Sequence, residues 1–194
     1  MKTIRIVYFS STGYTALVAE ALAKGIQTQP EVQVELLPIK GESIEKGRFT
    51  DEALLAKLDS ADALIFGTPT YMGGVAGQFK AFIDATAGAW YQRKWVGKLA
   101  GGFTTSGSAS GDKQGTLIYL QTFANQQGLI WVSQPEINSA AFGKNDGLNR
   151  LGSHSGVMGW NTNAYGAKPT LDAGDALTAE KYGAYFATQV ARLR

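Results

Sequence analysis

The stretch IRIVYFSSTGYTALVAEALAKG, residues 4–25, decides the fold. It begins with a short, continuous apolar run, residues 4–9, which is typical of a strand covered on both faces of a sheet. Apolar residues then recur at helical spacing over residues 14–28, which predicts an amphipathic helix. Between them lies loop A, residues 10–15, which carries four serine or threonine side chains and one glycine but no lysine.

Further apolar runs alternate with helical patterns along the chain. Strands are expected at residues 31–37, 62–69 and 128–133 and at the start of 98–111, and helices near 50–58, 75–83, 114–127 and 182–193. Five strands that alternate with helices predict an α/β fold, an open parallel sheet with helices on both faces. In such sheets, ligands bind outside the carboxyl ends of the strands.

Two more strands end in loops of unusual composition at that same edge: loop B, residues 68–74, and loop C, residues 104–111. The helix start at loop A offers unpaired N–H groups and a positive dipole end, and its hydroxyls add neutral donors, so it suits a phosphate monoester. Tyr71 and Met72 of loop B could line a flat ring, and loop C offers backbone donors. Each loop alone also has a structural reading, as a helix cap, a turn packed on the core or a mobile linker. Together they favour a mononucleotide with a planar ring.

Composition and motifs exclude several other functions. The 194 residues are expected to form one domain, 1–194, with a Gly-, Asn- and Ser-rich loop insertion at about 134–174. The formal net charge is only +2, without a basic block, so neither nucleic acid nor a membrane is an expected partner. There is no cysteine and only one histidine, His154, so we expect no metal site and a cytoplasmic location. Neither GxxxxGK[ST] nor GxGxxG occurs, which argues against a Walker loop and a dinucleotide fingerprint.

Loop A and its helix, from Ile6 to Leu22, resemble the FMN-phosphate signature of flavodoxins, and GTPTYMGGVAGQFKAFIDATAGAW, residues 67–90, is similar to WrbA-type NAD(P)H:quinone oxidoreductases. The resemblance implies a flavodoxin-like, doubly wound, five-stranded parallel sheet in the order 2-1-3-4-5. It also implies that loop A holds the FMN phosphate, that loop B flanks the isoalloxazine and that loop C meets its pyrimidine end. The implied cofactor-binding residues are Ser10, Ser11, Thr12, Gly13, Tyr14, Thr15, Pro69, Thr70, Tyr71, Met72, Gly73, Thr104, Thr105, Ser106, Gly107, Ser108 and Gly111.

The resemblance further implies a homodimer or homotetramer, in which Trp90 lies near a flavin, often across a subunit boundary. Trp90 and His154 are the candidate substrate contacts, although a lone loop histidine is more often solvated. Two interpretations of Trp160 and Tyr165 stay open: they close over the flavin, or they pack within the insertion.

The predicted function is FMN-dependent electron transfer from NAD(P)H, as a transient donor, to a quinone or similar small acceptor. The cofactor carries the chemistry, so no catalytic side chain is nominated. The alternatives are a flavodoxin-type electron carrier, which the slightly basic charge disfavours, and a non-catalytic FMN-binding regulatory protein.

Overall fold

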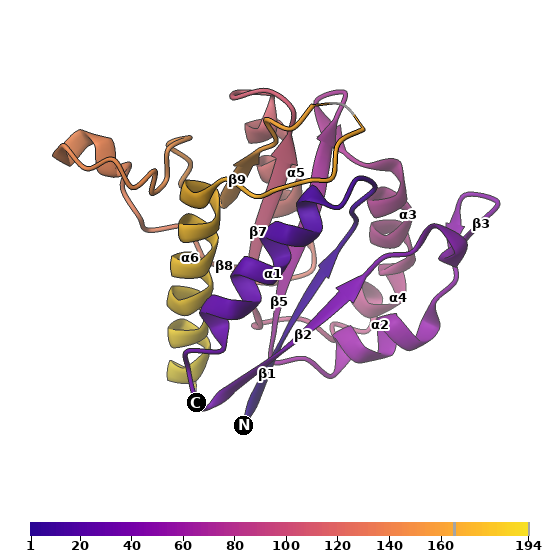
Figure 1. The fold of residues 1–194 in the computed structure, drawn as a ribbon. Coiled ribbons are helices and arrows are strands. Elements are labelled where there is room, and N and C mark those ends of the chain that lie inside the picture. The colour runs from indigo at the N-terminus through magenta and orange to yellow at the C-terminus, as the bar shows by residue number, and fades with distance from the viewer. Residues whose placement is uncertain (165, 194) are drawn as a thin grey trace.

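The computed structural model describes residues 1–164 and 166–193, so Tyr165 lies outside the described residues. A parallel sheet forms its centre, in the order β2-β1-β5-β7-β8 (Figure 1). In chain order these are the five predicted strands, so both the fold class and the order 2-1-3-4-5 are confirmed. Their bounds are β1 (Lys2–Tyr8), β2 (Val32–Pro38), β5 (Ala63–Tyr71), β7 (Leu99–Ser106) and β8 (Ile130–Trp131).

The fifth strand is interrupted. β8 pairs with the beginning of β7, where Leu99 lies opposite Ile130, and β9 (Val157–Trp160) pairs with its end, where Phe103 lies opposite Val157. Both pairings are parallel, so β8 and β9 continue the same edge of the sheet. The segment expected as a loop before the last helix therefore contains a sheet strand, and the inserted residues leave the sheet after β8 and return at β9.

Helices cover both faces of the sheet (Figure 1). On one face, α1 and α6 lie side by side, and on the other face α2, α3 and α5 pack against the alternate side chains of the same strands. Their bounds are α1 (Tyr14–Ile26), α2 (Glu52–Asp59), α3 (Gly77–Ala85), α4 (Ala87–Tyr91), α5 (Lys113–Gln126) and α6 (Ala173–Arg192). The short elements are η1 (Gly41–Ser43), β3 (Ile44–Glu45), β4 (Arg48–Phe49), β6 (Gly74–Val75) and η2 (Ser139–Phe142).

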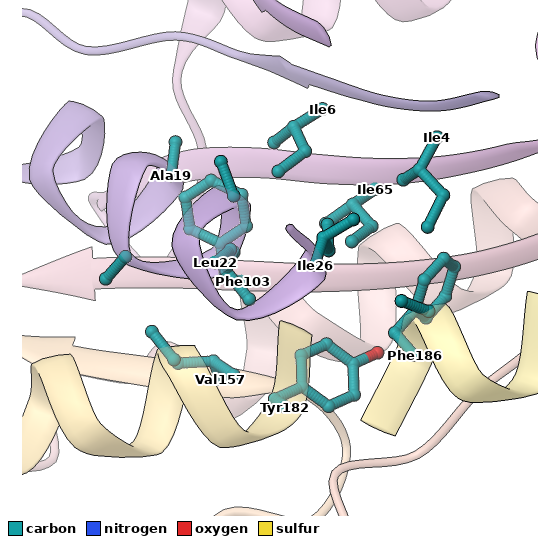
Figure 2. Close-up of a cluster of buried hydrophobic side chains, with 14 of the residues drawn as sticks. Ile4, Ile6, Ala19, Leu22, Ile26, Ile65, Phe103, Val157, Tyr182 and Phe186 are labelled. Atoms are coloured by element: carbon teal, nitrogen blue, oxygen red, sulfur yellow. The ribbon is translucent and has the colours of Figure 1, made fainter. Parts of the chain in front are cut away.

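The core beneath α1 and α6 is shown in Figure 2. Side chains of β1, β5 and β7, such as Ile4 and Phe103, meet Leu22 of α1 and Phe186 of α6, and all four are fully buried. The two helices approach closely because each has a glycine at the crossing. A Cβ on Gly25 would lie 1.9 Å from the carbonyl oxygen of Glu180, and one on Gly183 would lie 2.2 Å from that of Leu22. This contact fixes α1, and with it the loop that precedes α1.

No helix in residues 1–164 and 166–193 combines the length and the hydropathy needed to cross a bilayer. Within the same residues, no group of three or more histidine and carboxylate side chains is arranged to hold a metal ion.

Candidate functional site

Loops A, B and C follow β1, β5 and β7, three neighbouring parallel strands, and therefore meet at the carboxyl edge of the sheet. Hydroxyl groups join each pair of loops. The Ser11 hydroxyl of loop A contacts the Tyr71 hydroxyl of loop B. Thr15 Oγ1 of loop A lies 2.7 Å from Thr105 Oγ1 of loop C, and Thr70 Oγ1 of loop B lies 2.8 Å from Thr104 Oγ1 of loop C. The structure thus brings together the three loops that the sequence singled out. The three hydroxyl contacts link them directly to one another.

Loop A ends at the start of α1, where Gly13 is the N-cap residue with a left-handed φ of 90°. The Ser10 hydroxyl accepts a hydrogen bond from the Ala16 N–H at 3.2 Å, whereas the N–H groups of Tyr14 and Thr15 have no acceptor among the described residues. Ser11 and Thr12 are exposed, and the first turn of α1 carries no acidic residue. Free N–H groups, neutral hydroxyls and the helix dipole make this a site for an anion.

Two residues of loop A turn their side chains inward instead. The Tyr14 ring is buried, and its hydroxyl donates to the Trp160 carbonyl at 2.9 Å and to Asp175 Oδ2 at 3.1 Å. Burial first, and then the Asp175 carboxylate, raise the pKa of the Tyr14 hydroxyl far above its ordinary value, so it stays protonated. Thr15 is also buried against Thr105. Both residues face the anion site with their backbone N–H groups only.

Loop B is a β-hairpin. β5 continues through Pro69 to Tyr71 and turns at Met72 and Gly73, whose φ values of 48° and 79° are both left-handed, and β6 returns antiparallel. Positive φ at both central residues is the signature of a type I′ hairpin, which favours Asn or Gly rather than methionine. The Met72 side chain is fully exposed at the tip, and Tyr71 is half-exposed. An apolar side chain held outward on a strained turn is available to contact a ligand.

Thr70 and Thr104, two predicted cofactor-binding residues, have buried side chains. The Thr104 hydroxyl donates to the Thr68 carbonyl at 2.7 Å, and Thr70 Oγ1 lies 2.8 Å from both Thr104 Oγ1 and Thr116 Oγ1. These bonds use the hydroxyl protons inside the protein, so the two side chains fasten loop B to loop C and to α5. A ligand at the edge would meet these positions through backbone groups.

Loop C lies between two cavities. One, of about 490 Å³, is lined by Thr12, by Gly107 and by six residues of the insertion, Asn161, Asn163, Ala164, Gly166, Ala167 and Pro169. The other, of about 640 Å³, is lined by Gly73, by Ala109 and Ser110, by Asp112, Gln114 and Gly115 at the start of α5, by residues 150–153 and by Met158. Both volumes fall in the range of small-molecule sites, roughly 300–1,000 Å³.

Lys113, the first residue of α5, is a site residue that the sequence reasoning missed. Its side chain is fully buried, and its ammonium donates to Ser106 Oγ at 2.8 Å, to the Ser108 carbonyl at 2.7 Å and to the Ala109 carbonyl at 2.9 Å. Burial lowers the pKa of the Lys113 ammonium to about 8. The helix dipole favours acidic residues in the first turn of a helix, so a lysine at this position is unusual. That unusual position could have indicated a special role for Lys113.

Neither of the two candidate substrate contacts lines the cavities beside loop C. Trp90 is in α4, which precedes β7 and thus lies toward the opposite end of the sheet, and its side chain is half-exposed beside Gln126 and Gln127. His154 is an exposed residue of the insertion whose Nδ1 lies 3.0 Å from the Gln134 carbonyl oxygen. Trp160 packs within the insertion, with the Arg150 guanidinium 5.1 Å from its ring centre.

The sheet order and the three joined loops at its carboxyl edge define a flavodoxin-like α/β protein. Residues 4–142 match the family model described as NADPH-dependent FMN reductase, and the chain belongs to this family. It is 40% identical to flavodoxin FldP of Pseudomonas aeruginosa, over 92% of this chain and 91% of that protein. It is 35% identical to an NAD(P)H dehydrogenase (quinone) of Geobacter sulfurreducens, over 68% of this chain and 71% of that one.

A solved structure supports the same assignment. The WrbA-like flavodoxin of Agrobacterium tumefaciens is 35% identical, matches all of both chains and superposes with a TM-score of 0.73. Family membership confirms the predictions of a flavodoxin-like, WrbA-type fold, of FMN as cofactor and of oxidoreductase function.

Proposed function

We propose that this chain holds FMN at loops A, B and C and uses it to pass electrons from NAD(P)H to a quinone or a similar small acceptor. The observation that carries the proposal is the set of unpaired N–H groups and exposed neutral hydroxyls at the start of α1. No acidic residue of the first helical turn would repel a phosphate there. The flavin, when bound, accepts a hydride and returns two electrons, which no side chain of the protein can do.

The residues of the site then have separate tasks. Ser11, Thr12 and the first N–H groups of α1 bind the phosphate. The exposed Tyr71 and Met72 of loop B offer apolar surface to the ring. The hydroxyl contacts between the loops hold these groups at fixed positions, which lowers the entropy lost on binding. No acid, base or nucleophile of the chain is needed.

The direct test is anaerobic mixing of the purified, FMN-loaded protein with NADPH, followed by benzoquinone. We expect the flavin absorbance to bleach with NADPH and to return when the quinone is added, with one quinone reduced per NADPH oxidised. A protein that takes up no FMN, or a bound flavin that stays oxidised with both NADH and NADPH, would contradict the proposal.

An electron carrier is the second candidate, because a 40% identical relative is named as a flavodoxin. The same experiment separates the two functions. A carrier would not be reduced directly by NAD(P)H, but would bleach when a catalytic amount of a flavodoxin reductase is added.

We further propose that the protein works in the cytoplasm as a homodimer or homotetramer. The support for oligomers is three exposed apolar side chains within one short segment, Trp90, Tyr91 and Val96, which are 45%, 82% and 44% exposed. Light scattering after size exclusion is expected to give a mass of two or four chains. A Trp90→Ala, Tyr91→Ala double variant should shift that mass toward one chain. A monomeric wild-type protein would contradict the proposal.

A further inference from the structure

The burial of Lys113 requires an explanation beyond its hydrogen bonds. Its side chain has no exposed surface, yet it forms no ion pair with any carboxylate in the described residues. A buried charge without a counter-charge is costly, and natural proteins keep one where an anion binds or where chemistry needs it. Hydroxyl and carbonyl acceptors satisfy the three N–H bonds but bring no negative charge into contact with the ammonium.

The three acceptors all belong to loop C. The carbonyls of Ser108 and Ala109 turn toward the Lys113 ammonium and accept hydrogen bonds from it, so these acceptors of loop C point toward Lys113. The N–H groups of residues 108–111 have no acceptor among the described residues. Loop C therefore combines free backbone donors with a buried cation. Loop C borders both cavities. Its Gly107 lines the cavity that also contains Thr12, and its Ala109 and Ser110 line the cavity that also contains Gly73.

The carboxyl edge of the sheet thus has two places that can stabilise an anion, loop A and loop C, and they differ in kind. Loop A supplies neutral donors for a permanent anion, the phosphate. Loop C supplies a full positive charge with no permanent partner. A group that becomes anionic only during the reaction suits loop C, because preorganised donors and charges stabilise a charge that develops in the reaction. Fully reduced FMN, formed when the ring gains two electrons and one proton from NAD(P)H, is such a group.

We propose that Lys113 is a positioning residue that fixes loop C and selectively stabilises the reduced, anionic form of the bound flavin. This inference rests on the proposed FMN site. The oxidised ring is neutral and gains little from the charge, so Lys113 raises the affinity for reduced FMN over that for oxidised FMN.

The test compares wild type with Lys113→Gln, which keeps a donor but removes the charge, by spectroelectrochemical titration of the FMN-loaded protein. We expect Lys113→Gln to bind oxidised FMN within threefold of wild type and reduced FMN about tenfold more weakly. For a two-electron couple, tenfold corresponds to a midpoint potential about 30 mV more negative. The matched control is Lys98→Gln. Lys98 is a partly buried lysine at the other end of β7, bonded to the Asp59 carbonyl at 2.7 Å, and its replacement should leave the potential unchanged.

A second measurement uses wild type alone. Because its pKa is about 8, the Lys113 ammonium is half deprotonated at pH 8, and binding of reduced FMN should restore the proton. The midpoint potential of bound FMN should therefore fall more steeply with pH between 8 and 10 than that of free FMN. Asp175 favours the protonated ammonium and Arg150 disfavours it, and the exposed Asp112 adjoins it in the chain, so these groups set where the steep region begins.

The outcomes separate the possibilities. A more negative potential in Lys113→Gln, or the steep wild-type pH region if that variant does not fold, supports the proposal. Equal weakening of both FMN forms would show that Lys113 only fastens loop C, and an unchanged potential would show no effect of its charge; either result overturns the proposal. Wild type that takes up no FMN at all would instead refute the proposed function, and the inference with it.

Discussion

Replacing Thr12 by glutamate is expected to weaken FMN binding at least about 30-fold while leaving the fold intact. Thr12 is exposed and lies immediately before Gly13, the N-cap of α1. A carboxylate about 4 Å from a phosphate costs roughly 4 kcal/mol at a dielectric constant near 20. Solvent screening can halve this cost to about 2 kcal/mol. Since a factor of ten in affinity corresponds to about 1.4 kcal/mol, the affinity for FMN would still fall about 30-fold. The carboxylate also competes with the phosphate for the free N–H groups.

The measurement is quenching of FMN fluorescence on titration with the apoprotein. Thr122→Glu is the matched control, because Thr122 is an exposed threonine of α5 away from all three loops and its replacement adds the same charge. Riboflavin, which lacks the phosphate, is the second control. Its affinity should change far less in Thr12→Glu than that of FMN. If Thr12→Glu bound FMN as wild type does, the phosphate would not lie at loop A.

The architecture was predictable because buried parallel strands leave an unmistakable pattern. β1 and β5 are covered on both faces, so their apolar side chains form continuous runs, and the helical stripes between them give the alternation of a parallel sheet. β9 was not predictable. It has four residues, one of them glycine, inside a segment rich in glycine, serine and asparagine, and it exists because the chain pairs it with β7 more than 40 residues earlier.

At the site, sequence identified the loops but not the orientation of their side chains. The hydroxyls of loop A indicated an anion site, yet Thr15, Thr70 and Thr104 use their hydroxyls to join the loops. A loop that leaves a strand has no fixed period, so which side chain faces the ligand depends on tertiary contacts. Lys113 was missed for the same reason, because its burial depends on how loop C folds back over the start of α5.

The insertion is expected to depend on one buried carboxylate, Asp175. It accepts from Arg150 Nε at 2.7 Å and from Arg150 Nη2 at 3.0 Å, and Oδ2 also accepts from the Trp160 N–H at 2.8 Å. Asp175 is 2% exposed and receives the Tyr14 hydroxyl as well, so it joins α6, β9, the insertion and the first turn of α1. Removing one partner of a buried ion pair typically costs about 3–5 kcal/mol.

We therefore expect Asp175→Asn to lower the free energy of unfolding by about 3 kcal/mol, the lower end of that range, because Asp172 lies 3.2 Å from Arg150 Nε and retains part of the charge pairing. Urea titration followed by circular dichroism gives this value. The matched control is Asp84→Asn, which breaks an ion pair with Lys80 of 2.6 Å whose partners are 46% and 64% exposed, and should cost less than about 0.5 kcal/mol.

A double-mutant cycle assigns the loss to the pair itself. With Arg150→Met in place, Asp175→Asn should cost clearly less than it does alone, because no partly buried guanidinium is then left unpaired. The loss should also reach the site. Tyr14 is the residue after Gly13, so Asp175→Asn should weaken FMN binding, whereas Asp84→Asn should not. If Asp175→Asn stayed within 1 kcal/mol of wild type, or if its cost were the same with and without Arg150, the insertion would be held by its apolar contacts rather than by this carboxylate.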